Sequence, residues 1–348
     1  MRGVRVIGSG LIGTSIALAL SAKGIPVQMA DSDNGRAALA QDLVGSVDIG
    51  EVDLVVLALP TSHLAPVIAE QFSLYPTSAF IDVGSVKTRP LGEVERIPGL
   101  ARRFCGTHPM AGREIGGPEA ARSDLFQGRP WIYTPGPGCD PGVISLVIEL
   151  IELLGATPIR MSASEHDSAV ALISHLPQIG ASLIAKQLRV GPEAWLALAG
   201  QGIKDTTRIA ASDPVLWREI ISMNRDQIRP LLKNLNEDLD QLIDDFDDDH
   251  AVETFIEEGR AGRARIPGKH GGRARDYTFV PIVIEDKPGQ LAALFQECAD
   301  IAVNIEDLSI EHSPGQFTGL VTLALSKDDA IRLAEHLASK GWNVHPTR

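Results

Sequence analysis

The chain has little cysteine, a shortage of positive charge and no long hydrophobic run, and each of these features excludes a class of protein. Its 348 residues include only three cysteines, Cys105, Cys139 and Cys298. They lack the spacing of metal ligands, and an odd number does not form a disulfide framework. Lys and Arg total 32 against 45 Asp and Glu, a net charge of −13. This balance argues against nucleic acid or an anionic membrane as a partner.

Export and membrane insertion are not expected either. No apolar run approaches the roughly 20 residues that cross a bilayer. The first predicted strand begins at residue 3 or 4, which leaves no room for a signal peptide. We therefore expect a cytoplasmic protein, and its length suggests two or three domains.

A short apolar strand at the start of the chain runs directly into Gly-Ser-Gly-Leu-Ile-Gly. Gly8, Gly10 and Gly13 have the G-x-G-x-x-G spacing of a dinucleotide site. Gly8 permits a tight turn, Gly10 lets the backbone approach a pyrophosphate, and Gly13 lets the next helix pack closely on the sheet. Leu11 and Ile12 would begin that helix, whose first N–H groups would face the phosphates.

An acidic residue follows the second predicted strand. This strand covers residues 25–30 and ends at Asp31, eighteen positions after Gly13. A carboxylate at this point accepts hydrogen bonds from the adenosine ribose 2′-OH and repels a 2′-phosphate. The sequence therefore favours NAD as cofactor. NADP remains an alternative, because Arg36 follows closely and could meet a phosphate.

The pattern of apolar residues divides the chain into four parts. Residues 1–156 alternate strands and helices, which predicts an α/β, Rossmann-like domain with a parallel sheet covered on both faces. Residues 157–258 are helical with wide apolar faces, which predicts a dimerisation domain whose apolar faces are buried in a homodimer. Residues 259–276 are basic and glycine-rich, as in a flexible linker. Residues 277–348 have the βαββαβ order of a ferredoxin-like α+β domain.

Two polar residues follow predicted strands of the first domain. Ser85 comes after the strand at 79–83, and His108 comes after the strand at 103–106. Ligands of open α/β sheets lie beyond the carboxyl ends of the strands. We therefore expect both side chains to converge on the cofactor.

Further motifs occur in a fixed order along the chain. They are DVGSVK at 82–87, GTHPMAGREIGG at 106–117, SHLPQ at 174–178 and GIKDTTRIA at 202–210. With the glycine loop, these motifs resemble the prephenate dehydrogenase family of tyrosine biosynthesis, which includes arogenate dehydrogenases. The last domain, where Asp286-Lys287-Pro288-Gly289 opens the first helix, resembles an ACT domain, a module that senses small molecules and often amino acids.

The resemblance implies oxidation of a ring alcohol with loss of CO₂, giving 4-hydroxyphenylpyruvate from prephenate or tyrosine from arogenate. It implies that His108 is the catalytic base, a role that suits neutral imidazole. Ser85 would hydrogen-bond this histidine or the substrate hydroxyl. Arg208 would clamp a substrate carboxylate, since guanidinium binds carboxylates bidentately.

Three more residues acquire expected roles from the same motifs. Lys204 would add positive charge to the substrate pocket, His175 would position substrate from the helical domain, and Glu114 would lie near the pocket entrance. An amino-acid effector such as tyrosine or phenylalanine is expected at the ACT domain. Two other readings remain open: a hydroxyacid-type dehydrogenase or imine reductase, which places a catalytic lysine in the helical domain, and a non-enzymatic NAD-binding sensor.

Overall fold

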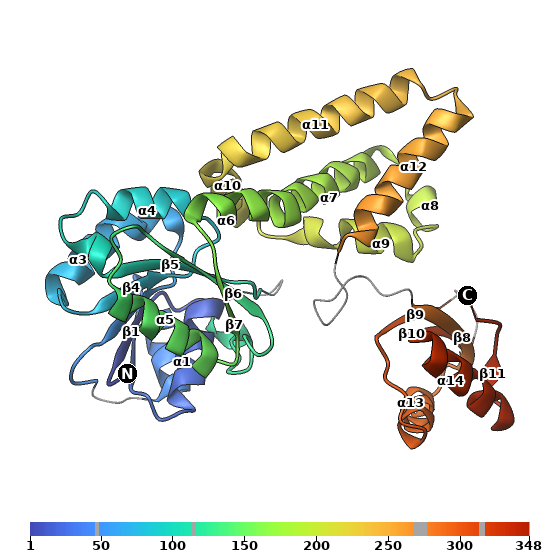
Figure 1. Cartoon of the computed structure of the whole chain (residues 1–348), viewed down its shortest axis with the longest axis horizontal. Coiled ribbons are helices and arrows are strands. Elements are labelled where there is room, and N and C mark those ends of the chain that lie inside the picture. The colour runs from blue at the N-terminus through green and yellow to red at the C-terminus, as the bar shows by residue number, and fades with distance from the viewer. Residues whose placement is uncertain (46–48, 113–115, 267–276, 313–316, 348) are drawn as a thin grey trace. The chain divides into compact units, whose positions relative to one another are not determined.

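The computed structural model describes residues 1–45, 49–112, 116–266, 277–312 and 317–347 (Figure 1). The chain forms two compact units, Met1–Glu237 and Asp238–Arg348. The first unit holds a seven-stranded sheet and most of the helical segment. The second holds the end of that segment and a four-stranded sheet.

The large sheet has the order β2-β1-β3-β4-β5-β6-β7. Its strands are β1 (Val4–Ile7), β2 (Val27–Ala30), β3 (Leu54–Leu57), β4 (Ala79–Asp82), β5 (Phe104–Pro109), β6 (Pro130–Pro135) and β7 (Thr157–Arg160). The strands from β2 to β5 pair in parallel, which confirms the expected Rossmann-like sheet. The strand order reverses at β1, so the glycine loop lies at the switch point where α/β sheets bind nucleotides.

The outer part of the sheet is not parallel as predicted. β6 runs antiparallel to β5, with His108 opposite Ile132, and β7 is parallel to β6. The segment 110–129 between β5 and β6 contains, in its described part, only the short turn η3 (Pro118–Ala120). A parallel return needs a crossover, usually a helix. Without one, the chain turns back beside β5 in the opposite direction.

Helices cover both faces of the sheet (Figure 1). The helices α1 (Leu11–Ser21), α2 (Asn34–Val44) and α5 (Pro141–Leu153) pack on one face, and α3 (Leu64–Leu74) and α4 (Thr88–Val94) pack on the other. In β3, Leu54 and Val56 join the first cluster while Val55 and Leu57 join the second. Because successive strand residues point to opposite faces, a strand covered on both sides needs this unbroken apolar run.

The segment after β7 is helical. It contains α6 (Ala163–Val170), η4 (Ala171–His175), α7 (Leu176–Gln187), η5 (Leu188–Val190), α8 (Glu193–Leu196), α9 (Gln201–Thr207), η6 (Arg208–Ala211), α10 (Pro214–Met223), α11 (Arg225–Asp244) and α12 (Asp249–Ala264). Ser162 and Glu165 form a capping box that starts α6. η4 is a π-helical turn just before Pro177, whose missing N–H leaves the carbonyl of Ile173 without its usual helical donor.

One stretch of this segment is more apolar than expected. Ala163–Val190 is long and apolar enough to cross a membrane by length and composition, with a mean hydropathy of 1.4 over 18 residues. The expectation that no run approaches that length was therefore wrong. The stretch nevertheless carries His166, Asp167 and His175 as buried polar residues, and 28% of its most apolar window is buried within the chain.

The helical segment also extends further than predicted. α12 continues to Ala264, through residues expected to begin a flexible linker at 259. The Glu257 and Arg260 side chains pair at 2.6 Å one turn apart, which supports the helix despite its glycines. Residues 267–276 of the expected linker lie outside the residues that the structure describes.

The C-terminal part folds around its own small core. Its elements are β8 (Thr278–Glu285), α13 (Gln290–Asp300), β9 (Asp307–His312), β10 (Thr318–Leu325), α14 (Lys327–Ser339) and β11 (Asn343–Val344). The strands pair antiparallel in the order β11-β8-β10-β9. Leu294 of α13 and Leu333 of α14 pack with inward residues of β8 and β10. The predicted βαββαβ order is confirmed.

Candidate active site

The glycine loop leads from β1 into α1. Gly8 has φ +107°, and a Cβ there would lie 2.1 Å from the Ala58 carbonyl oxygen. A Cβ at Gly13 would lie 2.0 Å from the carbonyl oxygen of Gly8, whereas the space beside Gly10 is open. No side chain of the described residues caps α1, and the buried Ser9 hydroxyl has no partner among them. The loop therefore fits a dinucleotide, with helix amides facing its phosphates.

Asp31 lies directly beside this loop. One carboxylate oxygen accepts the backbone N–H of Ser9 at 2.7 Å, and the other accepts that of Asp33 at 2.9 Å. Arg36 is paired with Asp33 at 3.8 Å on the surface. The acid is thus placed next to the phosphate-binding loop, as a ribose 2′-OH acceptor must be.

His108 belongs to a buried chain of hydrogen bonds. Its Nδ1 lies 2.8 Å from Nε2 of His166, and Nδ1 of His166 lies 2.8 Å from Oδ1 of Asp167. His166 and Asp167 are almost fully buried, whereas His108 remains partly exposed. Desolvation by the surrounding protein, with the nearby His166, Lys87 and His175, holds the pKa of His108 well below its ordinary value. Its ring is therefore a neutral base near pH 7.

Asp167 also connects the helical segment to the sheet. Its two carboxylate oxygens accept the backbone N–H groups of Lys87 and Thr88, each at 2.8 Å, at the start of α4. Burial alone would raise the pKa of Asp167, but the hydrogen bonds from His166, Thr88 and Lys87 lower it below its ordinary value. The carboxylate therefore stays ionised and fixes α6 against the edge that carries His108.

His175 lies in the same network and has a defined tautomer. Asn224 donates one amide hydrogen to the backbone oxygen of Asp167 at 2.8 Å and contacts Nδ1 of His175 at 3.1 Å. A flipped amide would place its oxygen against that carbonyl, so the NH₂ group must face both acceptors. Nδ1 of His175 thus accepts, and its proton resides on Nε2. Burial lowers the pKa of His175 to about 4, although the negative charge of Asp167 acts to raise it.

A buried ion pair supports the loop that carries Ser85. The Lys87 ammonium contacts the Asp82 carboxylate and donates to the carbonyl oxygen of Thr107 at 2.6 Å. Asp82 also accepts the N–H of Gly84 at 3.1 Å. Burial lowers the pKa of Lys87 although Asp82 opposes this shift. The pair thereby fixes the turn after β4 next to β5.

The predicted site residues fall into two groups. Asp82 pairs with Gly106 across β4 and β5, so Ser85 and His108 lie at one edge. His108 is within β5 and not beyond its end as expected, because the pairing of β5 with β6 continues to Pro109.

The second group lies further along the helices. Lys204 on α9 and Arg208 at the start of η6 are exposed, and both of these elements pack against α7. Glu114 lies outside the residues that the structure describes.

The chain is similar to known proteins over nearly its whole length. A model of the prephenate dehydrogenase nucleotide-binding domain matches residues 16–160, and a model of the prephenate dehydrogenase dimerization domain matches residues 162–257. A probable prephenate dehydrogenase of Streptomyces niveus is 31% identical over 98% of this chain and 99% of its own length. The chain belongs to the prephenate dehydrogenase family.

Solved structures of this family share the fold. A prephenate dehydrogenase from A. aeolicus, in complex with hydroxyphenyl propionate and NAD⁺, matches with a TM-score of 0.66 and 30% identity over 77% of this chain and 99% of that one. A Synechocystis arogenate dehydrogenase matches with a TM-score of 0.65 and 25% identity, covering 75% of this chain and 98% of that one.

Three polar residues of this site are not among those expected from the sequence. His166 and Asp167 stand side by side at the start of the helical segment, and Asn224 follows α10. The available signal in the sequence was the adjacent pair of His166 and Asp167, which follows the helix-capping Ser162. A histidine in a helix gives no sign by itself that it faces another domain.

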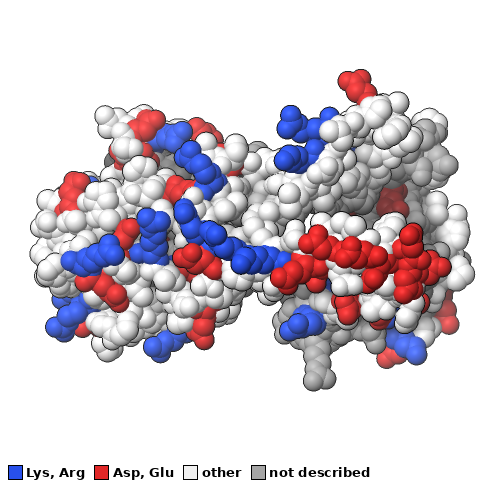
Figure 2. Space-filling model, turned by 90° about the horizontal axis from the view of Figure 1, so that it is seen from above, with Lys and Arg blue, Asp and Glu red and all other residues white. Residues whose placement is uncertain are grey.

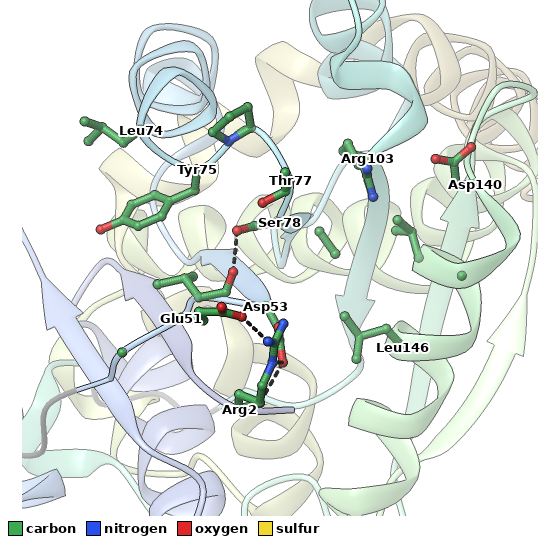
Figure 3. A pocket seen from close by; sticks show the side chains of 16 residues that line it. Arg2, Glu51, Asp53, Leu74, Tyr75, Thr77, Ser78, Arg103, Asp140 and Leu146 are labelled. Carbon is green, nitrogen blue, oxygen red and sulfur yellow. Dashed lines mark hydrogen bonds and ion pairs between the residues drawn. The ribbon is translucent and has the colours of Figure 1, made fainter.

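One cavity among the described residues lies elsewhere. It encloses about 840 Å³ at the amino ends of β3 and β4, where Arg2 points toward Glu51 and Asp53 (Figure 3). The residues described above gather at the carboxyl ends of the strands. This cavity therefore lies at the opposite edge of the sheet from the candidate active site.

Proposed function

We propose that this chain catalyses the NAD-dependent oxidative decarboxylation of prephenate to 4-hydroxyphenylpyruvate in tyrosine biosynthesis. The observation that carries the proposal is His108, a neutral base backed by a buried histidine and carboxylate at the sheet edge that also carries the glycine loop. The chain is an oxidoreductase of the prephenate dehydrogenase family, and NAD is its cofactor.

His108 supplies the base of this reaction. Its Nε2 accepts the proton of the ring hydroxyl of the substrate, while Ser85 hydrogen-bonds the same hydroxyl or the imidazole. Gly8, Gly10, Gly13 and Asp31 would hold NAD, which would supply the acceptor for the hydride that leaves the hydroxyl-bearing carbon. The bond between the ring and its carboxylate then breaks and CO₂ leaves. The electron pair of that bond completes the aromatic ring, and the ring oxygen takes back the proton from His108 to become the hydroxyl of the product.

The substrate needs cations and donors for its carboxylates. Arg208 is proposed as the bidentate clamp, with Lys204 adding positive charge. His175 offers an Nε2–H donor from the helical side, because Asn224 occupies its Nδ1. Glu114 is proposed at the pocket entrance.

Arogenate remains the second candidate substrate, favoured by the similarity to the Synechocystis arogenate dehydrogenase. Prephenate and arogenate differ only by a keto or an amino group on the side chain. The test is kcat/KM of the purified chain for both substrates with NAD and with NADP, followed by absorbance of the reduced cofactor. Preference for prephenate with NAD is expected. No turnover in any combination would reject the proposal and favour an NAD-binding sensor.

The helical residues 157–258 are proposed to form a homodimer. Large apolar side chains lie exposed there, among them Leu172, Ile173, Leu183, Ile184, Leu235 and Leu239. Apart from Asp226 in its first turn, α11 also segregates its charge: Arg225, Arg229 and Lys233 precede Glu237, Asp238, Asp240 and Asp244. Viewed from above, a band of basic side chains runs into an acidic patch (Figure 2).

This charge order opposes the dipole of the helix itself. An antiparallel second copy of α11 would bring the basic half of one helix against the acidic half of the other. Light scattering should give the mass of a dimer, and a monomer at micromolar concentration would contradict the proposal.

Residues 277–348 are proposed to form a ferredoxin-like ACT domain that binds an amino acid, joined to the helical domain by the residues that follow α12. The βαββαβ order and the strand order β11-β8-β10-β9 support this assignment. Tyrosine or phenylalanine should change the activity of the full chain, and deletion of 277–348 should abolish that response. An unchanged response after deletion would place the effector elsewhere. The biosynthetic role implies a cytoplasmic location, and residues 1–156 are proposed as the nucleotide-binding domain.

A further inference from the structure

We propose that His166 and Asp167 are positioning residues for His108, which hold its proton on Nδ1, leave the lone pair on Nε2, and take up positive charge when Nε2 is protonated. The inference deepens the proposed function and rests on it, since it concerns the same base. It adds two residues that no sequence motif identified above had assigned.

The hydrogen-bond chain fixes each proton in turn. The ionised carboxylate of Asp167 can only accept, so Nδ1 of His166, 2.8 Å away, must donate. In a neutral imidazole the other nitrogen is then an acceptor. Nε2 of His166 therefore accepts from Nδ1 of His108, also at 2.8 Å. The remaining nitrogen of His108, Nε2, carries the free lone pair that a base requires.

The reverse arrangement is disfavoured. If His108 carried its proton on Nε2, its Nδ1 would accept from Nε2–H of His166. The Nδ1 lone pair of His166 would then face the carboxylate of Asp167 at 2.8 Å with no proton between them. Such an unpaired contact between buried groups costs free energy. The reverse tautomer would also leave His108 without a basic nitrogen.

Asp167 is itself held so that it cannot turn away. It is 2% exposed, and the backbone amides of Lys87 and Thr88 bind its two oxygens. These amides belong to the chain that follows β4, while His108 lies on the adjacent β5. The Asp167 carboxylate is thus held at the same sheet edge as His108, the base that it orients through His166.

The proton transfers balance along this chain. The substrate O–H bond breaks and its proton binds Nε2 of His108, while the C–H bond of the hydroxyl-bearing carbon breaks and releases the hydride, for which bound NAD would be the acceptor. The Nδ1 proton of His108 can move to Nε2 of His166, so the positive charge comes to rest next to the Asp167 carboxylate. As CO₂ leaves and the ring becomes aromatic, the proton returns along the same path to Nε2 of His108 and from there to the ring oxygen, which thereby becomes the hydroxyl of the product.

The test uses the full-length chain with ¹⁵N-labelled histidine and three variants. His166→Phe keeps a ring but offers no acceptor to His108. His166→Gln offers an amide oxygen in place of Nε2 but cannot take a proton. Ser168→Ala is the matched control, since Ser168 is on the same helix and bonds Ser164 and Gln227 instead.

We expect ¹⁵N spectra of the unmodified chain to show His108 protonated on Nδ1, and His166→Phe to lose this preference. For kcat with prephenate, we expect a loss of about 100-fold or more in His166→Phe, a smaller loss in His166→Gln, and no change in Ser168→Ala. KM for NAD should stay within about threefold in all variants.

Three results would overturn the proposal. The first is an Nε2-protonated His108 in the unmodified chain. The second is a kcat of His166→Phe within about threefold of the unmodified chain. The third is an equal loss of kcat in the Phe and Gln variants that follows their melting temperatures, as a structural role alone would give. Because the spectra need no turnover, they decide the tautomer even if prephenate proves not to be the substrate.

Discussion

Asp167 accepts the backbone N–H of Thr88 at 2.8 Å, across 79 positions of sequence. This contact joins α6, the first helix of the helical segment, to the start of α4. The same carboxylate orients His166, which in turn contacts His108. The candidate active site is therefore assembled by a contact between the two parts of the chain that the family models match separately.

Replacing the proposed base should abolish turnover without loss of cofactor binding. We expect His108→Asn to lower kcat by about 100-fold or more, because an amide side chain cannot take up the hydroxyl proton as neutral imidazole does. NAD affinity, measured by fluorescence titration, should be unchanged. His250→Asn on α12 makes the same chemical change at an exposed position and should retain full activity. Near-normal kcat in His108→Asn would reject the assignment.

Loss of the proposed anion clamp should act on substrate affinity. Arg208→Ala should raise KM for prephenate about tenfold or more and leave KM for NAD unchanged, since a charge-assisted pair to carboxylate is worth roughly 1.5–3 kcal/mol. Arg208→Lys should recover part of the loss. The control is Arg189→Ala on η5. Equal increases in both KM values would indicate a general structural effect.

Asp31 should set the choice of cofactor. Asp31→Asn retains an oxygen for the Ser9 amide but removes the charge that repels a 2′-phosphate. We expect KM for NADP to fall and KM for NAD to rise, measured in the same preparation. Asp42→Asn on α2 is the matched control. An unaltered ratio of kcat/KM for NAD and NADP would show that Asp31 does not contact the ribose.

Stability should fall in mild acid because of the buried neutral histidines. The pKa of His175 is about 4 in the folded chain and about 6.5 when unfolded. Below pH 6.5 the unfolded chain therefore binds a proton that the folded chain does not. The free energy of unfolding should decrease as pH falls from 6.5 to 4, by up to about 3 kcal/mol from this residue.

Urea denaturation at pH 7 and pH 5 measures this decrease. His175→Gln removes the titrating group and should flatten the dependence, although the lowered pKa of His108 leaves a remainder. The prediction would be wrong if the free energy of unfolding of His175→Gln changed with pH as steeply as that of the unmodified chain.

Much of the first domain could be predicted from the sequence. The apolar run at 54–57, the glycine loop and Asp31 each depend on local spacing, and local spacing determines where strands end and turns begin. The antiparallel direction of β6 was not predicted, because strand direction does not follow from local spacing. Strand direction depends on the path of the connection, and the segment 110–129 does not reveal that path by its residue pattern.

The sequence by itself therefore determined the cofactor loop, the βαββαβ order of the C-terminal part, and the motifs that bring Ser85 and His108 to one edge of the sheet. Only the tertiary structure decided which side chains form the hydrogen-bond chain that includes His108. His166 lies 58 positions from His108, and Asn224 lies 49 from His175. Hydrogen bonds between such distant side chains depend on how helices pack on a sheet. No periodicity along the chain encodes that packing, because period and propensity describe neighbours within a few turns.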